Sequence, residues 1–311
     1  MKNSILKLCA SALFVSTLFV SCNKESVQPV TTSYLSVEDA TRGLKLIDMD
    51  GMTPIHVEPI DQYSVKVEFL QSARPYSLDL RLQNSQDLLG KIKKAIAENS
   101  PLSIAVPENS TSIVKVNPPS VTALLDYQES LKYDPKASVR AMTVVSSEAE
   151  LMKLFNYLKN QPIPFKYIAD GCYARAHKMR QLMLQKGIEC KKQFVYGSLR
   201  AFNGYCCTSW VYHVAPLVKV KTSNGRVVEK IIDPSMFQEP VAPETWRNAC
   251  INSQNCKGPV NITEYVNTDG AVYYYNNYSK TSVYDNDYRK TNDVIRDYTG
   301  LEGCGNNSYY Y

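Results

Sequence analysis

Three residues in the second half of the chain, Cys172, His213 and Asp233, have the side chains of a nucleophile, a base and an orienting acid. A cysteine thiolate attacks a carbonyl carbon when a histidine takes up its proton and a carboxylate orients that histidine. Cys172 follows a glycine in DGCYARAH, at the expected start of a helix. Free backbone N–H groups there favour a thiolate and can hold an oxyanion, so we expect a lowered thiol pKa. The alternative for Cys172 is one half of a disulfide.

His213 is the candidate base because the other two histidines are poorly placed. Five helical steps from Cys172 to His177 correspond to a rotation of about 500° and a rise of about 7.5 Å, so His177 should point away as a surface or packing residue. His56 lies in a region without cysteine. His213 stands in the apolar segment SWVYHVAPLV, where the alternative is an ordinary core histidine.

Asp233 is the candidate orienting acid because a hairpin should bring it back to His213. The Asn224-Gly225 pair is a strong turn signal, and folding on it places Asp233 within about three positions of His213. Pro234 holds the aspartate extended, although an aspartate before proline is often only a turn residue. A cysteine at a helix start, with histidine and aspartate on adjacent strands, is the layout of papain-like and transglutaminase-like folds. The spacing does not decide between them.

Trp210 and Tyr212 flank His213 and are candidate substrate-binding residues. Both have the strand parity opposite to His213, which favours packing behind the strand over lining a substrate channel. Because two of the three histidines are unavailable, no zinc site is expected. Nucleophilic catalysis of this kind requires no other cofactor.

The first part of the chain, residues 36–130, predicts a small α/β unit. Apolar residues alternate in YSVKVEFL and YSLDLRL, which predicts half-buried strands, and TSIVKVNPP predicts another short strand. Between them lies an amphipathic segment that Asn84 or Ser85 can cap as a helix reaching Asn99.

The second part predicts helices followed by strands. Ser147 can cap a first helix, and a second helix runs from Cys172 to Gln185, where Gly187 ends it. Three strand-like segments follow: KQFVYGSL, TSWVYHVAPLVKV and RVVEKIIDPSMF. The Tyr- and Asn-rich tail, VYYYNNYSKTSVYDNDY, predicts irregular surface structure.

An exposed linker over residues 131–145 should separate the two parts. Pro135 interrupts regular structure, and Lys136 and Arg140 are basic points of the kind that proteases cut in exposed segments. The expected catalytic domain is therefore residues 137–311. A plain inter-domain loop is the alternative for the linker.

The first 22 residues predict an export signal of the lipoprotein type. Lys2 and Lys7 precede an apolar run from Leu8 to Val20 that is too short to span a membrane. The segment LFVSC makes Cys22 the expected lipid attachment site, with an exported form without lipid as the alternative. The protein is then expected in the cell envelope, at the outer membrane, held only by that lipid.

Composition is that of an ordinary globular protein, with 44% hydrophobic and 21% charged residues. The net charge of +5 is spread without a basic run, which argues against a nucleic-acid partner. Seven cysteines lie from Cys172 onward, and an exported protein should pair most of them. Seven is odd, so at least one thiol stays free, and the neighbours Cys206 and Cys207 should have different partners.

Five blocks of sequence, in unbroken order, resemble the bacterial protein glutaminases over residues 145–256: DGCYARAHKMRQLM, KKQFVYGSL, CCTSWVYHVAPLV, IIDPSMF and WRNAC. Those enzymes are secreted protein-glutamine deamidases made as pre-pro-enzymes. The resemblance implies an α+β fold with a papain-like or transglutaminase-like cysteine hydrolase core, whose Cys-bearing helix packs on an antiparallel sheet, preceded by a small α/β pro-domain. It makes Cys172 the nucleophile, His213 the base and Asp233 the orienting acid, and residues 23–136 an inhibitory pro-segment.

The reaction implied by the resemblance is hydrolysis of the side-chain carboxamide of protein-bound glutamine, through a thioester, with release of ammonia and without metal or cofactor. The implied partners are proteins or peptides with an exposed glutamine and a protease that activates the zymogen, and a monomer is expected. Three alternatives stay open. A transglutaminase would pass the same thioester to a lysine amine, a cysteine peptidase would cut the main chain, and a surface-binding lipoprotein would hold Cys172 in a disulfide.

Overall fold

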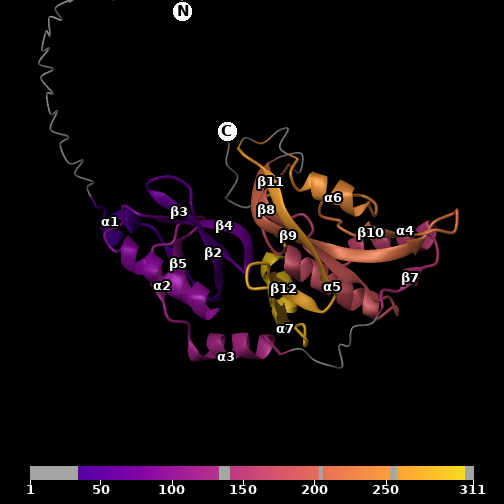
Figure 1. The fold of residues 1–311 in the computed structure, drawn as a ribbon, viewed down its shortest axis with the longest axis horizontal. Helices are drawn as coiled ribbons and strands as arrows, with labels where there is room; N and C mark the ends of the chain where they lie inside the picture. Colours follow the sequence, from indigo (N-terminus) through magenta and orange to yellow (C-terminus); the bar gives the residue numbers. More distant parts are fainter. Residues whose placement is uncertain (1–33, 133–140, 203–205, 253–255, 257, 305–311) are drawn as a thin grey trace, which may run out of the picture. The chain divides into compact units, whose positions relative to one another are not determined.

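The computed structural model describes residues 34–132, 141–202, 206–252, 256 and 258–304 (Figure 1). The expected signal sequence, with Cys22, and the expected cleavage points Lys136 and Arg140 lie outside these residues. In the part of the chain that the structure describes, no helix is long and apolar enough to cross a membrane. We call residues 34–132 the N-terminal subdomain and residues 141–304 the C-terminal subdomain. Both belong to one compact unit.

The N-terminal subdomain contains two antiparallel sheets of three strands each, with the orders β1-β5-β6 and β2-β3-β4 (Figure 1). The predicted strands and the predicted long helix are confirmed. The elements are α1 (Val37–Thr41), β1 (Leu46–Met52), β2 (Pro54–Pro59), β3 (Ser64–Phe69), β4 (Ser72–Asp79), α2 (Ser85–Glu98), β5 (Leu102–Pro107), β6 (Lys115–Asn117) and α3 (Val121–Ser130).

Helix α2 closes the core of this subdomain. Its apolar residues Leu88, Leu89 and Ile92 recur at helical spacing and are buried, and the helix ends at Asn99 in the left-handed conformation. These three residues belong to a hydrophobic cluster that extends from Met52 to Val116 and contains only residues of the N-terminal subdomain. The N-terminal subdomain therefore has a hydrophobic core of its own.

The C-terminal subdomain is built on a sheet with the strand order β10-β9-β8-β11, to which β7 adds a parallel pair with β9. The elements are β7 (Val144–Val145), α4 (Glu148–Lys159), α5 (Cys172–Leu184), β8 (Lys191–Phe202), β9 (Cys207–Lys221), β10 (Val227–Ile231), α6 (Pro243–Ala249), β11 (Asn261–Asp269), β12 (Val272–Asn276), β13 (Thr281–Tyr284) and α7 (Arg289–Tyr298). The described fold is α+β, as expected.

Helix α5 packs against β9 and against α7 (Figure 1). Its sequence is not amphipathic, because it is enclosed on several sides: nine of its residues are buried, among them Arg175 and His177. The predicted start at Cys172 is confirmed, and Gly187 follows the helix end with φ 72°. The predicted hairpin at Gly225 is also confirmed, since β10 pairs with β9 in antiparallel register.

The prediction that the Tyr- and Asn-rich tail is irregular is wrong. It forms β12 and β13, and Tyr273 and Tyr274 are buried at 0% and 5% exposure. In this segment tyrosine side chains face the core in place of aliphatic ones. A strand prediction that counts only aliphatic residues therefore misses these strands. The expected linker is also shorter than predicted, because Val144 and Val145 already pair with β9.

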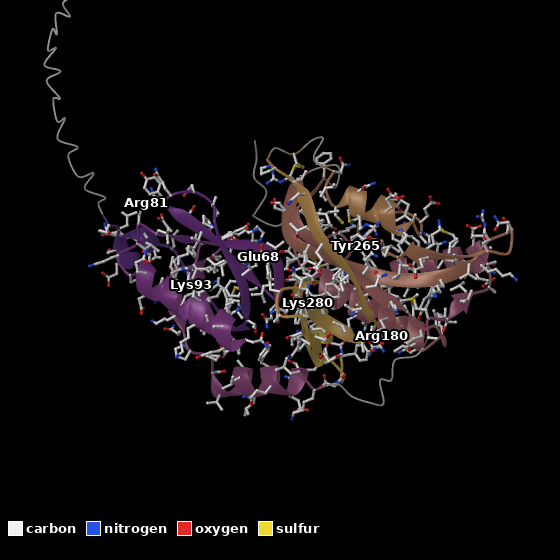
Figure 2. The ribbon with its side chains drawn as sticks, viewed as in Figure 1. Glu68, Arg81, Lys93, Arg180, Tyr265 and Lys280 are labelled. Carbon is white, nitrogen blue, oxygen red and sulfur yellow. A yellow bond between two sulfur atoms is a disulfide. The ribbon has the colours of Figure 1, made fainter. Side chains whose placement is uncertain are left out.

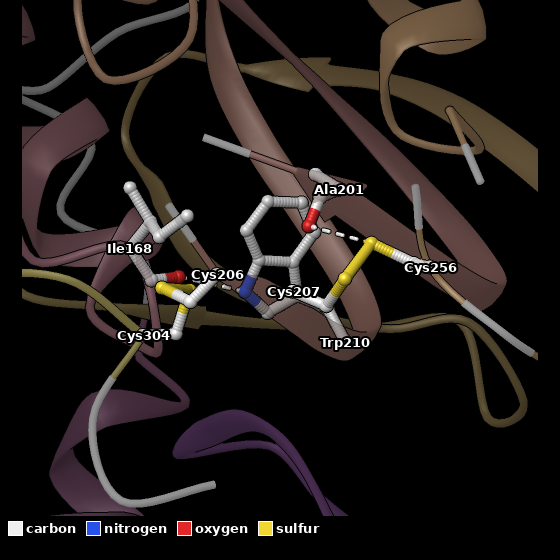
Figure 3. The surroundings of a disulfide bond; sticks show 7 residues. All are labelled: Ile168, Ala201, Cys206, Cys207, Trp210, Cys256 and Cys304. Atoms are coloured by element: carbon white, nitrogen blue, oxygen red, sulfur yellow. Dashed lines mark hydrogen bonds between the residues drawn. A yellow bond between two sulfur atoms is a disulfide. The ribbon is translucent and has the colours of Figure 1, made fainter. Parts of the chain in front are cut away.

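Two disulfides are present among the described residues, and they join the neighbours to different partners, as predicted (Figure 3). Cys206 pairs with Cys304, and Cys207 pairs with Cys256. The other three cysteines of the described residues, Cys172, Cys190 and Cys250, are buried free thiols. Cys172 is therefore not half of a disulfide in this structure.

Candidate active site

Gly171 allows Cys172 to begin helix α5. It adopts φ 78° at the N-cap, in the left-handed region that favours glycine. A Cβ at this position would lie 2.7 Å from Cδ2 of Tyr298 in α7, so any other residue would have to displace that ring. The packing of Gly171 against α7 thus fixes the backbone from which the thiol projects.

The thiol of Cys172 is enclosed, and only 2% of the residue is exposed. Burial raises the pKa of Cys172 to about 12, although Arg175 and the backbone N–H of Val214 act in the opposite direction. The lowered pKa expected from the helix N-terminus is therefore wrong for this state, because the loss of water outweighs the favourable neighbours. The thiol is protonated as long as it stays covered.

His213 lies in β9 and is bonded to Asp233, with 2.8 Å between Nε2 and Oδ2. The antiparallel pairing of β10 with β9 reaches Ile231 opposite Leu217, and Asp233 follows just beyond the strand end. A carboxylate only accepts hydrogen bonds, so Nε2 donates to Asp233 and Nδ1 is the ring nitrogen that faces away from it. Among the described residues, none forms a hydrogen bond with Nδ1.

Cys172 meets β9 at the residue after this histidine. The backbone N–H of Val214 lowers the pKa of the Cys172 thiol and the charge of Asp233 raises it, so both groups lie close enough to act on the sulfur. The structure therefore brings all three sequence-predicted residues into one buried cluster, with Nδ1 of His213 as the ring nitrogen left unused.

The carboxylate of Asp233 is held in its charged form. Burial would raise its pKa, but attraction to His213 and hydrogen bonds from His213, Ser235 and Trp246 lower the pKa of Asp233 to about 2. The Nε1–H of Trp246 donates to Oδ2 at 2.9 Å, and the backbone N–H and hydroxyl of Ser235 both donate to Oδ1. These donors fix the orientation that the carboxylate imposes on the imidazole.

Both tryptophans of the chain stack on His213. The ring of Trp210 lies 4.6 Å away at an angle of 9°, and that of Trp246 lies 5.3 Å away at 28°. The Nε1–H of Trp210 also donates to the carbonyl of Ile168 at 2.8 Å (Figure 3). Strand parity sets where a Cβ points, but the indole ring is long enough to reach the histidine. Trp210 is a buried packing residue, and its ring packs on His213 itself.

Tyr212 faces the N-terminal subdomain. Its hydroxyl donates to the carbonyl of Leu70 at 2.9 Å, and the residue is 3% exposed. Leu70 belongs to the turn between β3 and β4, which we call the covering turn (residues 70–73). Tyr212 is thus a contact of that turn rather than a residue open to solvent.

Asp170, two residues before the thiol, holds the same turn. Its Oδ2 accepts the hydroxyl of Ser72 at 2.6 Å, and its Oδ1 accepts the backbone N–H of Ala73 at 3.0 Å. Leu70 and Ala73 are 2% and 0% exposed and belong to the hydrophobic cluster that contains Cys172. The covering turn is therefore packed into the same hydrophobic core as the thiol.

The other two histidines are engaged away from the Cys172 thiol, in bonds of their own. His56 stacks on Tyr278, at 4.4 Å and 11°, and the Tyr278 hydroxyl donates to Glu68 of β3 at 3.3 Å. His177 is a packing residue and is not at the surface, with 1% exposure. Its Nδ1 lies 2.7 Å from Nζ of the fully buried Lys192.

Sequence reasoning missed three residues that complete this site: Trp246, Ser235 and Asp170. Each had a signal that could have been used. Trp246 is one of only two tryptophans, and Ser235 and Asp170 each lie two residues from a predicted catalytic residue. Short polar residues at that distance commonly bond back to a buried carboxylate or to a neighbouring segment.

An open cavity of about 1110 Å³ lies beside the site and is lined only by the C-terminal subdomain. It begins at Pro234 and Ser235, directly after Asp233, and no residue of the covering turn lines it. Over the described residues, no group of three or more His, Cys, Asp or Glu side chains is arranged to hold a metal ion.

Comparison with known proteins places the chain among similar sequences and folds. A family model described as glutaminase matches residues 151–250. Two crystal structures of pro-protein-glutaminase, one of them a mutant, are each 37% identical and superpose with TM-scores of 0.75 and 0.73. The alignments cover 84% and 83% of this chain and 95% of each of those chains. A crystal structure of protein-glutaminase is 44% identical, with a TM-score of 0.50, over 53% of this chain and 93% of that one. A search of curated proteins gives no match.

Proposed function

Because the chain belongs to the protein-glutaminase family, we propose that it hydrolyses the side-chain carboxamide of protein-bound glutamine to glutamate and releases ammonia. The observation that carries this proposal is the 2.8 Å pair of His213 and Asp233 beside a buried, unpaired Cys172 at a helix start. A nucleophile, a base and an orienting carboxylate in this arrangement are suited to acyl transfer.

In the first half of the reaction, Nδ1 of His213 takes the thiol proton of Cys172, and the sulfur attacks the carboxamide carbon. The carbonyl oxygen becomes an oxyanion, for which the backbone N–H groups at the start of α5 are the available donors. The imidazolium then gives its proton to the amide nitrogen, the C–N bond breaks, and ammonia leaves. A γ-glutamyl thioester on Cys172 remains.

In the second half, His213 removes a proton from water, and the hydroxide attacks the thioester carbon. The C–S bond breaks, and the sulfur recovers a proton from His213. Asp233 keeps its charge throughout and stabilises the imidazolium in both halves, as its lowered pKa requires. The sum is carboxamide plus water giving carboxylate plus ammonium, and neither metal nor cofactor takes part.

Trp210 and Tyr212 both lie in β9, and we propose a different role for each of them. Trp210 stacks on His213 and is a positioning residue for the imidazole. The hydroxyl of Tyr212 donates to a main-chain carbonyl in the covered state, so it is suited to hold a carbonyl of a protein substrate once the covering turn has left. Recognition of main-chain groups favours glutamine within a polypeptide.

Residues 23–136 are proposed to be an inhibitory pro-segment and residues 137–311 the catalytic domain. The covering turn supports this, because it packs into the same hydrophobic core as Cys172 and occupies Asp170 and Tyr212. The alignments with pro-protein-glutaminase extend over 84% of the chain, whereas that with protein-glutaminase extends over 53%. An activating protease would cut the linker near Lys136 or Arg140.

The N-terminal region supports an exported zymogen. We propose that residues 1–22 are a lipoprotein-type signal and that Cys22 carries the lipid, which holds the protein at the outer membrane. Cleavage of the linker would then free the catalytic domain from the lipid. The disulfides Cys206–Cys304 and Cys207–Cys256 fit an oxidising compartment. We expect the enzyme to act as a monomer.

The test is to incubate the cleaved protein with casein. Ammonia release without cross-linked products and without new N-termini is expected, since cross-linking would indicate a transglutaminase and new N-termini a peptidase. Cys172→Ala should abolish ammonia release. Cys190→Ala, which removes another buried free thiol, is the matched control and should retain it. Unchanged ammonia release by Cys172→Ala would contradict the mechanism.

A further inference from the structure

The two subdomains also meet at the start of α7, in a contact that does not involve the covering turn. Nη2 of Arg289 is 3.1 Å from Oδ1 of Asp126 in α3, and Nη1 is 3.5 Å from Oδ2. Lys290 Nζ donates to the carbonyl of Asp126 at 3.4 Å, and Asn286 Nδ2 donates to the carbonyl of Lys132 at 3.3 Å. We call Asn286, Arg289 and Lys290 the α3 docking site.

Hydrogen bonds hold the segment that carries the docking site in place. The carboxylate of Asp285 accepts the backbone N–H and the hydroxyl of Thr291, at 2.8 and 2.6 Å, which fixes the first turn of α7. The backbone carbonyl of Asp285 meets Nε2 of His177 at 3.2 Å, and Arg180 (Figure 2) donates to the Tyr288 hydroxyl at 2.8 Å. His177 and Arg180 belong to α5. The docking site is therefore fixed to the helix that carries the nucleophile.

An apolar anchor accompanies the charged contacts. Tyr127, next to Asp126, is 5% exposed and belongs to the buried cluster of the C-terminal subdomain. Interfaces commonly draw most of their binding energy from such buried aromatic residues. Asp126 and Arg289 keep 37% and 56% of their side chains exposed. Their pair therefore sets orientation and salt dependence more than total affinity.

The position of α3 in the chain gives this contact a consequence for activation. Helix α3 ends at Ser130, shortly before the linker in which we propose cleavage. A cut there severs the chain, but it removes neither the α3 contact nor the covering turn. Together with the stacking of His56 on Tyr278, these contacts attach one body at several points. Such contacts reinforce one another, because each holds the others at a high local concentration.

We propose that the N-terminal subdomain, once cut from the chain, stays bound through the α3 docking site and the covering turn and continues to inhibit the enzyme until it dissociates. The partner that the docking site fits is a helix that presents an aspartate beside a buried tyrosine. This inference rests on the proposed zymogen function, although the binding itself does not require catalysis. Activity should therefore follow release of the N-terminal subdomain and lag behind the cut.

The test begins with the uncut chain, cleaved by limited trypsin to a product that mass spectrometry shows to be cut once, in the linker. The product is run through size exclusion at about 0.01 M and at about 1 M salt, where charges are screened beyond about 30 Å and 3 Å. We expect the two fragments to elute together at low salt and the separated fraction to increase at high salt. Ammonia release should appear only in the separated catalytic fragment.

Charge variants locate the contact. Asp126→Arg and Arg289→Asp should each raise the dissociation constant of the fragments by about tenfold, and the double exchange should restore much of the loss. Asp87→Arg is the matched control, because it makes the same charge change at a residue paired with Lys91 within α2. It should leave the dissociation constant unchanged.

Fragments that separate immediately at low salt would overturn the proposal, and so would charge variants that dissociate like the wild type. The separation can be repeated with Cys172→Ala, which binds without catalysing. If the fragments dissociate as expected but the released fragment produces no ammonia, the proposed function is contradicted, whereas the proposed docking site is still supported. Failures of the two proposals are thus distinguishable.

Discussion

The carboxylate of Asp170 accepts the backbone N–H of Ala73 at 3.0 Å, which joins the residue two places before the nucleophile to the turn that covers it. The same carboxylate accepts the hydroxyl of Ser72 at 2.6 Å. The residue that binds the covering turn, Asp170, and the proposed nucleophile, Cys172, therefore lie in the same short segment at the start of α5. A change at the covering turn should act on the thiol directly.

Ala73→Trp should give activity without cleavage. Ala73 is 0% exposed within the hydrophobic cluster that contains Cys172, and overpacking a buried site costs about 1–3 kcal/mol, which should open the covering turn about fivefold to a hundredfold more often. Ammonia release by the uncut variant measures the effect. Ala97→Trp, on the exposed face of α2, is the control and should leave the uncut chain inactive. An uncut Ala73→Trp protein as inactive as the wild type would argue against inhibition by this turn.

Alkylation of Cys172 should be slow before cleavage and fast after release. The covered thiol has a pKa of about 12, so at pH 8 only about one molecule in ten thousand carries the thiolate. Iodoacetamide labelling followed by peptide mass spectrometry should show at least a hundredfold increase in rate once the N-terminal subdomain is gone. Cys190 and Cys250 are buried in the C-terminal subdomain and serve as internal controls. Equal labelling of Cys172 before and after release would contradict the burial argument.

Asp233→Asn should reduce activity by about a hundredfold to ten-thousandfold, because the amide favours the wrong imidazole tautomer. It should also change the acid stability. The pKa of Asp233 is lowered to about 2, so its contribution to the free energy of unfolding is present above pH 4 and is lost as pH falls toward 2. The contribution is about 2 kcal/mol. Urea unfolding at pH 7 and pH 3 measures it, and a variant with the wild-type pH dependence would exclude this role.

His177→Gln should reduce the decrease in the free energy of unfolding between pH 7 and pH 5. Burial, followed by the charges of Lys192 and Arg180, lowers the pKa of His177 well below its usual value. Below pH 6.5 the unfolded chain therefore binds a proton that the folded chain does not, and the free energy of unfolding falls by up to about 1.4 kcal/mol per pH unit. Chemical denaturation between pH 7 and pH 5 should show a smaller slope in the variant. His56→Gln is the control, and equal slopes for His177→Gln and wild type would refute the assignment.

Much of the site follows from local sequence. Gly171 before Cys172 predicts the helix start, and the Asn224-Gly225 turn brings Asp233 back to His213 because strand pairing fixes register. These inferences need only short-range geometry. The helical rotation that separates His177 from Cys172 is of the same kind.

What the sequence could not give depends on contacts between distant segments. The covering turn meets Asp170 across 97 residues, and the pKa of Cys172 is raised by burial, which local sequence does not show. The stacking of Trp210 on His213 depends on a side-chain rotamer, which strand parity does not fix. The partners of Cys206 and Cys207 depend on how the last strands fold back. Tertiary burial, rather than propensity, decides each of these features.

The separate core of the N-terminal subdomain has a consequence for the order in which the molecule is made. Chains are synthesised from the N-terminus, and this core closes between Met52 and Val116 without help from later residues. The sheet of the C-terminal subdomain cannot be completed before β11 has been synthesised. The Cys206–Cys304 disulfide cannot form before Cys304, 98 residues after Cys206, has been synthesised. The inhibitor can therefore be folded before the enzyme exists, so that the nucleophile is covered from the moment its pocket forms.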